Sequence, residues 1–503
     1  MNVSTSNFDA EQGNAGGAAI TVVTKSGTNE FKGSAFVFYN NQNFNARPYF
    51  ATEKPEASSH IDGATLGGPI SRDKLFFFGA WERQFQRTPQ QFFYDVPPAA
   101  LRAGDFSQAF NRDGSLQIIY NPFTGNPDGT GREPFPGNRI PAALFSPVAQ
   151  QIQALYPDIN IPTASTANGN VGGVPIYRNF VRRQDRKFDR NNYDFKINYN
   201  YSPSNQVWGK YSRMGADVTS PQAYLGYDGA LTGETTVQQY TFGDTLTINS
   251  TTVFDATLGI SRMTQTAEES DIALGNFGRE VLGIPGMNGG TNFADDRRYG
   301  GIPAFLMRCA SGPMVRIQCG CWCGFSTVGN LNGWDPVERD ERTYSVASNL
   351  TKLKGAHELR FGYQVNKLRM DHWQPAGYGP RGLMQAATNA TGLNGGEQDP
   401  NIYNAYASLL LGLMDVAGAS VQYELMTTRE WQHNMYARDR WQMNNKLTLD
   451  LGLRYEYYPL MTRADRASSA SSAQTIWRAH GAWRRTPARS RLMRRASFAP
   501  PSC

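Results

Sequence analysis

The sequence predicts an all-β fold, an antiparallel transmembrane β-barrel of which this chain holds about eleven strands, with long extracellular loops. Three observations predict it. Apolar and polar side chains alternate over many segments of about ten residues, the connections between those segments alternate between short and long, and no run of 18 uncharged apolar residues exists. Ten residues at a tilt cross a bilayer as a strand, whereas a membrane-spanning helix needs about twenty apolar residues. A helical membrane protein is therefore excluded.

Segment 191–201 shows the alternation most clearly, with one aromatic and one polar face. Successive side chains of a strand point to opposite sides, so Tyr193, Phe195, Ile197, Tyr199 and Tyr201 share one face. Period-2 alternation of this kind is the main sequence signal for a strand. From the N-terminus onward it predicts strands over 34–40, 63–70, 75–85, 191–201, 207–214, 240–248, 253–263, 343–353, 357–370, 436–443 and 447–458.

The connections separate into two kinds that alternate along the chain. Short turns are expected at 71–74, 202–205, 249–252, 353–356 and 444–446, and long connections at about 41–60, 86–191, 215–236, 265–341 and 371–430. Barrels of the bacterial outer membrane have tight periplasmic turns and large extracellular loops. A soluble sandwich has no reason to place every long loop at one end.

The apolar face is expected to contact lipid and the polar face to line a wet lumen. In segment 447–458, Asp450, Arg454 and Glu456 share the face opposite the leucines. A charged residue at mid-depth on the lipid face would cost about 2–4 kcal/mol. The alternative is a soluble all-β protein whose apolar faces meet inside, which explains the alternation but not the asymmetry of the loops.

The longest connection is expected to contain one short helix. Residues 89–175 include twelve prolines, and Ser146 followed by Pro147 is a good helix start, an N-cap and then the first turn. Val148, Ile152 and Leu155 then fall on one side. We expect a compact outer loop built around this helix.

Charge and cysteine content exclude some functions and leave others open. Residues 467–503 contain seven Arg and no Lys, Asp or Glu, so the preceding 466 residues carry −1 of the chain's net +6, which argues against nucleic-acid binding by the body of the protein. Four of the five cysteines cluster at Cys309, Cys319, Cys321 and Cys323. Their C-x-C-x-C spacing is poor for zinc, and a disulfide or free thiols in a surface loop are the alternatives.

Catalytic or metal-binding constellations are not predicted. The five histidines are scattered, without H-x-x-x-H or H-E-x-x-H spacing. "DHW" at 371–373 is expected at a strand end, and the acidic segment 289–301 in a solvated loop. We predict neither an enzyme nor a cofactor.

Four stretches, in order, resemble TonB-dependent outer-membrane receptors of the Oar-like type. They are "GGAAITVVTKSGTNEFKGSAFVFYNN", "GATLGGPISRDKLFFFGAWE", "FPGNRIPAALFSPVAQQI" and "YARDRWQMNNKLTLDLGLRYEYYP". The resemblance implies a plugged barrel of about 22 strands, of which this chain has half, and transport driven by the TonB–ExbB–ExbD complex. It divides the chain into the C-terminal end of a plug (1–30), a partial barrel (31–466) and a basic low-complexity tail (467–503).

Several departures from the family pattern accompany the resemblance. Signal peptide, coupling box and most of the plug are missing from the sequence, so Met1 resembles an internal start. The tail, and the Cys-rich break near 305–323, resemble a GC-rich gene translated out of frame. We expect half a barrel, expressed alone, to aggregate, because unpaired strand edges in hydrocarbon cost several kcal/mol per backbone group.

The expected function is TonB-dependent uptake of a scarce solute, such as a siderophore, oligosaccharide or peptide, across the outer membrane. The lipid of that membrane and the TonB complex are the expected partners. The alternatives are a structural or adhesive outer-membrane barrel, and a soluble secreted β-sandwich that binds carbohydrate. The loops carry no transferable motif, so the sequence predicts neither the solute nor any ligand-binding residue.

Overall fold

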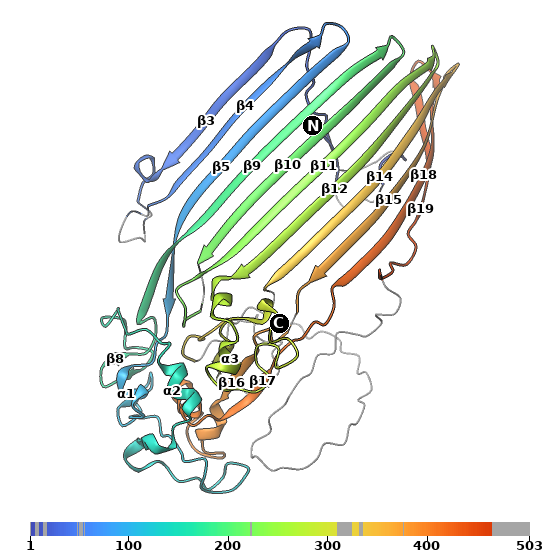
Figure 1. The fold of residues 1–503 in the computed structure, drawn as a ribbon. Coiled ribbons are helices and arrows are strands. Elements are labelled where there is room, and N and C mark those ends of the chain that lie inside the picture. Colours follow the sequence, from blue (N-terminus) through green and yellow to red (C-terminus); the bar gives the residue numbers. More distant parts are fainter. Residues whose placement is uncertain are drawn as a thin grey trace.

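The computed structural model describes residues 2–5, 10–13, 18–47, 49, 54, 56–221, 224–308, 324–330, 335–375 and 377–464. Its main feature is one antiparallel sheet of eleven strands that follow one another in chain order (Figure 1). The strands are β3 (Lys32–Asn41), β4 (Ser58–Ser71), β5 (Leu75–Tyr94), β9 (Phe180–Ser202), β10 (Asn205–Pro221), β11 (Ala230–Asn249), β12 (Thr252–Glu269), β14 (Val337–Lys354), β15 (His357–Trp373), β18 (Met426–Asn444) and β19 (Leu447–Tyr457). Each strand expected from the alternation is present, so the predicted antiparallel sheet is confirmed.

Most strands are longer than the ten residues expected. β5 has 20 residues and β9 has 23, about twice what a tilted strand needs to cross a bilayer. The extracellular half of β9 is mostly polar on both faces, as in "VRRQDRKFDR", and that of β5 contains the polar run "QRTPQQ", so the alternation gave no signal there. Cross-strand ion pairs join these halves instead, for example Arg87 to Asp189 at 2.7 Å.

The register of the sheet keeps the apolar side chains on one face. Val207 lies opposite Tyr199, Phe242 opposite Gly209, and Leu258 opposite both Phe242 and Val346. These side chains remain accessible; Phe242 is 51% exposed. Among the described residues no second sheet stacks on this face, so the β-sandwich alternative is wrong.

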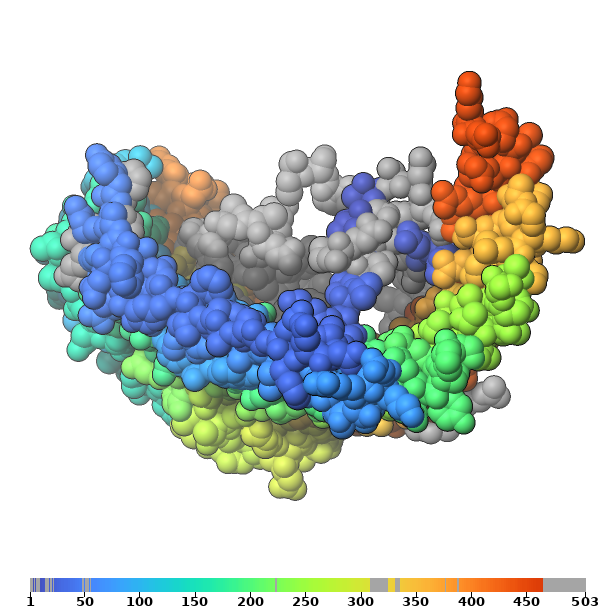
Figure 2. All heavy atoms as spheres, turned by 90° about the horizontal axis from the view of Figure 1, so that it is seen from above, coloured from blue at the N-terminus to red at the C-terminus, as the bar shows by residue number. Residues whose placement is uncertain are grey.

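The sheet curves into a wall with one hollow side (Figure 2). Described N-terminal residues lie inside the hollow, against the polar face, and the apolar face points outward. The N-terminal segment includes a two-stranded sheet of β1 (Asn2–Ser4) and β2 (Ala19–Thr21). The wall does not close, because β3 and β19 lie at its two edges.

The two kinds of connection lie at opposite ends of the wall, as predicted (Figure 1). Tight turns join β4 to β5, β9 to β10, β11 to β12, β14 to β15 and β18 to β19. Asp73 and Gly355 adopt positive φ in two of these turns (63° and 60°), a conformation that glycine reaches without the steric cost that other residues pay. Among the described residues no helix is long and apolar enough to span a membrane.

The long connections pack together into one cap. The cap contains four short helices, α1 (Ala99–Arg102), α2 (Pro147–Gln153), α3 (Phe277–Glu280) and α4 (Ile402–Leu410), and short 3-10 turns. It also contains two three-stranded sheets. One is formed by β6 (Ala109–Phe110), β7 (Asn170–Val171) and β8 (Val174–Pro175), and the other by β13 (Ala304–Arg308), β16 (Leu383–Ala387) and β17 (Met414–Gly418). Ser146 precedes α2, so the predicted helix start is confirmed. The loop that contains α2 also packs on another long connection: α2 packs with α4, and the Ser146 amide donates to the Leu410 carbonyl at 2.8 Å.

The hydrophobic core of the molecule lies in this cap rather than under the sheet. All nine residues of α4 are buried, and buried apolar residues from the other loops surround them, including Ile119, Val171, Leu225 and Phe305. Asn401 caps α4 with its side chain, and Asn404 completes the capping box. Burial of this kind supplies most of the stability of a folded unit.

Candidate functional site

The hollow face of the wall is lined by charged and amide side chains joined in a lattice. Glu82 pairs with Arg190 at 2.7 Å, and Asp194 with Lys210 at 3.3 Å. Further along, the Asn349 amide donates to Asp255 at 2.7 Å. Such a face needs water, because isolated charges are costly in an apolar medium. The lattice fits the wet lumen predicted from the sequence.

The N-terminal segment is bound to this lattice by two arginines from the far side of the wall. Arg360 of β15 pairs with Glu11 at 2.5 Å, and Arg454 of β19 donates to the carbonyl oxygens of Ala10 (3.3 Å) and Glu11 (3.0 Å). At Gly452 a Cβ atom would come within 2.6 Å of the Ala10 Cβ. Close approach of the segment thus requires glycine at 452.

A buried ion pair holds the cap loops to one another. Arg381 and Asp271, both almost fully buried, are joined at 3.1 Å, and Asp335 lies 4.0 Å from the same guanidinium. Asp271 also accepts from the Ile302 amide at 2.9 Å. Burial raises the pKa of the Asp335 carboxyl, although Arg381 acts in the opposite direction. The three charged residues come from two long connections, β12–β14 and β15–β18.

A polar cleft of about 720 Å³ opens in the cap between the β5–β9 and β15–β18 connections. Amide side chains form its wall: Asn401 donates to Asn111 and to Gln117, both at 2.8 Å, and Gln117 donates to Asn404 at 2.8 Å. Tyr177 adds an aromatic surface. Amides offer both donors and acceptors, so the cleft can bind a polar uncharged molecule.

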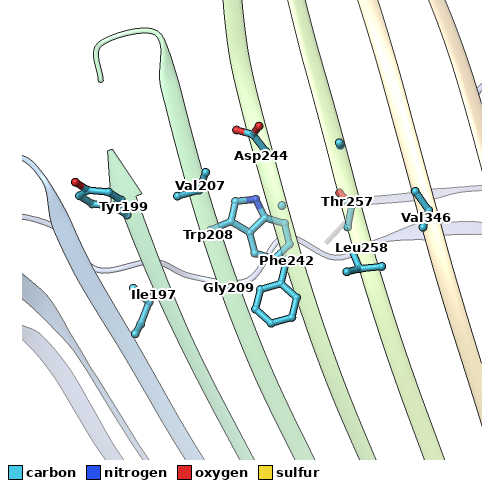
Figure 3. Close-up of a pocket in the computed structure, with 12 residues that line it drawn as sticks. Ile197, Tyr199, Val207, Trp208, Gly209, Phe242, Asp244, Thr257, Leu258 and Val346 are labelled. Carbon is cyan, nitrogen blue, oxygen red and sulfur yellow. The ribbon is translucent and has the colours of Figure 1, made fainter. Parts of the chain in front are cut away.

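A second hollow, of about 580 Å³, lies on the outward face and is apolar (Figure 3). Tyr199, Phe242, Leu258 and Val346 surround it, and Gly209 leaves the space between them. Because this face carries the lipid-facing residues predicted from the sequence, the hollow fits acyl chains and not a polar solute.

The other residues considered in the sequence do not form a site among the described residues. Asp371 and His372 point to opposite faces of β15, and Asp371 pairs with Arg429 at 2.6 Å. Within the described part of the chain no group of three His, Cys, Asp or Glu side chains is arranged to hold a metal. Cys309, Cys319, Cys321 and Cys323 lie outside the described residues. Segment 289–301 is part of the cap; residues 290–298, with both of its acids, are exposed or half-buried, whereas Tyr299 is fully buried.

Sequence reasoning missed the polar cleft and the arginines that hold the N-terminal segment. The cleft joins residues almost 300 positions apart, such as Asn111 and Asn401, and no local pattern indicates that contact. Arg360 and Arg454 carried a partial signal, since both lie on polar faces of predicted strands.

A single curved antiparallel sheet with an apolar outward face, a charged inner face and long connections at one end defines a β-barrel protein of the bacterial outer membrane. The chain belongs to the family described as the outer membrane beta barrel domain, whose model matches residues 23–487. Over 95 residues it is 35% identical to the TonB-dependent transporter Oar of Myxococcus xanthus, a match that covers 17% of this chain and 9% of that protein. The resemblance to TonB-dependent receptors is thereby borne out.

Solved structures of outer-membrane transporters resemble the chain more distantly. The transporter YddB of Escherichia coli is 9% identical with a TM-score of 0.43, covering 94% of this chain and 44% of YddB. The ferric enterobactin receptor PfeA of Pseudomonas aeruginosa is 13% identical with a TM-score of 0.40, covering 90% and 43%. At these TM-scores the likenesses give no independent evidence. The chain spans less than half the length of each of these proteins.

The predicted division at 1–30, 31–466 and 467–503 stays a prediction. The family match begins at residue 23 and runs past residue 466 to residue 487. Residues 467–503 lie outside the described part of the chain.

Proposed function

We propose that this chain is part of a TonB-dependent receptor that takes up a polar solute, an oligosaccharide or a peptide, through the outer membrane. The proposal is narrower than the family assignment, because neither a solute nor energy coupling follows from membership. The observation that carries it is the N-terminal segment held inside a charged, hollow wall by Arg360 and Arg454. A segment in that place would have to move for a solute to pass, which is the task of a plug.

The amide cleft of the cap supports the choice of solute. Neutral amide groups lie beside Tyr177 in the cleft, a combination that suits the hydroxyl groups and apolar faces of a saccharide, or a peptide backbone. Arg112 lines it together with Asp113, Glu397 and Asp399, so its acidic residues outnumber the basic one. A ferric siderophore, which is anionic in many cases, would find no excess of positive charge there.

The structural or adhesive alternative has no specific support among the described residues. An anchor does not need a charged lumen or a segment held within it. The relative found by sequence, Oar of Myxococcus xanthus, is a TonB-dependent transporter.

The experiment is an uptake assay in the source bacterium, with the receptor gene deleted and the complete receptor, of which this chain is a part, restored. Cells receive a labelled maltooligosaccharide, a labelled pentapeptide or a ferric catecholate, with and without an intact TonB gene. We expect uptake of the saccharide or the peptide, only when TonB is present. Tyr177→Ala should lower the apparent affinity about two- to tenfold, from the ~0.5–1.5 kcal/mol of an aromatic contact, while Tyr49→Ala, an exposed tyrosine outside the cleft, should not.

Two results would contradict the proposal. TonB-independent accumulation would mean a passive pore. Uptake of the ferric catecholate alone, unaffected by Tyr177→Ala, would move recognition away from the amide cleft.

A further inference from the structure

The outward face changes from apolar to basic at one position on several strands. On β5 the outward residue beyond Trp81, toward the cap, is Arg83. On β10 Arg213 follows Tyr211, and on β14 Arg342 follows Tyr344 in the same direction. Aromatic side chains mark the membrane interface of a barrel. These arginines therefore stand just outside the apolar band, where lipid headgroups begin.

Two more strands repeat the pattern, and a third completes a belt of six arginines. On β12 Arg262 follows Ile260, and on β18 Arg429 follows Trp431. On β15 Arg369 follows Lys367, which is itself basic. All six positions are occupied by Arg and none by Lys. We define the arginine belt as Arg83, Arg213, Arg262, Arg342, Arg369 and Arg429.

Four members of the belt form an unbroken row across neighbouring strands. Arg262 is directly opposite Arg342, Arg342 opposite Arg369, and Arg369 opposite Arg429. Like charges directly opposite one another destabilise a sheet. A row of four guanidinium groups is thus unfavourable unless anions lie between them.

The chain itself supplies only part of the anions that the belt requires. Asp340 accepts from both Arg262 (2.9 Å) and Arg342 (2.8 Å), and Asp371 accepts from Arg429 (2.6 Å). Asp62 lies opposite Arg83 in the register, but its carboxylate lies 3.9 Å from His60 and forms no ion pair with Arg83. The side chains of Arg83, Arg213 and Arg369 form no hydrogen bond or ion pair with the described residues, although the Arg83 guanidinium lies over the Phe85 ring. Six arginines against three aspartates leave the belt with an excess of three positive charges.

We propose that the arginine belt binds the phosphate groups of a phosphorylated glycolipid of the lipopolysaccharide class in the outer leaflet. A phosphate monoester carries up to two negative charges and three acceptor oxygens, which matches a row of neighbouring guanidinium groups. Arg is suited to such binding because its planar fork pairs with phosphate in a bidentate manner. The aromatic rings beside the belt would contact the upper part of the acyl chains.

The test compares the binding of different lipids to the full chain, which is extracted from outer membranes into detergent. A short-chain diphosphorylated glycolipid is titrated while the fluorescence of Trp81 and Trp431, the neighbours of Arg83 and Arg429, is recorded. We expect saturable binding that the dephosphorylated glycolipid does not show and that millimolar inorganic phosphate does not displace. The triple variant R83Q/R213Q/R369Q should bind about 100-fold more weakly, from roughly fivefold for each basic residue near an anionic lipid surface.

A matched variant separates the belt from overall charge. R72Q/K74Q/K446Q also removes three positive charges, but in the periplasmic turns at the other end of the wall, and should bind as the unaltered chain does. R83K/R213K/R369K keeps the charge and loses the bidentate geometry, so an intermediate loss is expected even if the glutamine variant fails to fold. Equal binding of the phosphorylated and dephosphorylated glycolipids, displacement by inorganic phosphate, or equal losses in the two glutamine variants would overturn the proposal.

Discussion

Replacement of Arg381 by methionine should loosen the cap loops from one another without unfolding the wall. The substitution keeps most of the side-chain volume and removes the only cation within 4.0 Å of Asp271 and Asp335 among the described residues. Asp271 is 0% exposed and would retain the Ile302 amide as a partner. Removal of one member of a buried ion pair costs about 3–5 kcal/mol, which is a factor of about 10² to nearly 10⁴ in a local opening equilibrium.

Hydrogen exchange followed by mass spectrometry measures that opening directly. Amides of the segment around Asp271 and Ile302 should exchange faster by this factor, while amides of β10 and β11 should not change. Arg297→Met is the matched control, because Arg297 pairs with Glu268 at the surface, where an ion pair contributes about 0–1 kcal/mol. The double variant D271N/R381M should recover part of the protection. Less than a tenfold acceleration in R381M would refute the view that this pair holds the cap together.

Three further predictions concern the wall, the N-terminal segment and pH. Leu258→Arg places a charge on the lipid face and should lower the free energy of unfolding in lipid vesicles by about 2–4 kcal/mol, as measured by urea titration. Thr257→Arg, on the inner face, should have a much smaller effect. Equal losses of unfolding free energy in the two variants would mean that the faces are misassigned. Gly452→Val should displace the N-terminal segment, because the new Cβ atom would lie 2.6 Å from the Ala10 Cβ atom. Limited proteolysis should then cut the chain faster near residue 11. An unchanged cleavage rate would count against the contact between Gly452 and Ala10. Burial raises the pKa of the Asp335 carboxyl above its ordinary value of 3.8. Its contribution to cap stability is therefore fully present below pH 3.8 and is lost as the pH rises through the raised pKa. In hydrogen exchange corrected for intrinsic rates, D335N should remove this pH dependence.

The sheet could be predicted from the sequence because each strand separates lipid from water. That separation produces the strict alternation of Phe195 and Tyr199 with Lys196 and Asn198, and it is absent where both faces meet water. The strand ends beyond residue 86 in β5 and before residue 191 in β9 were missed for this reason. Their pairing depends on cross-strand partners such as Arg87 and Asp189, which no local pattern connects.

The cap could not be predicted, because its core residues come from irregular segments far apart in the chain. Ile119 and Leu225 have no periodic neighbours, and they are buried only when four connections meet around α4. The polar cleft depends on the same assembly. The arginine belt is different: the spacing of Tyr211 with Arg213, or of Tyr344 with Arg342, is visible in the sequence once the outward face of each strand is known.

The number of strands restricts how the wall can be completed. Eleven strands, each antiparallel to the next, leave β3 and β19 running in the same direction. Direct closure of β19 onto β3, or a ring of two identical copies, would thus require parallel seams. Purely antiparallel closure calls for an odd number of additional strands, the first and last of which run opposite to β19 and β3, so a second copy of this arc in the same membrane orientation cannot supply them.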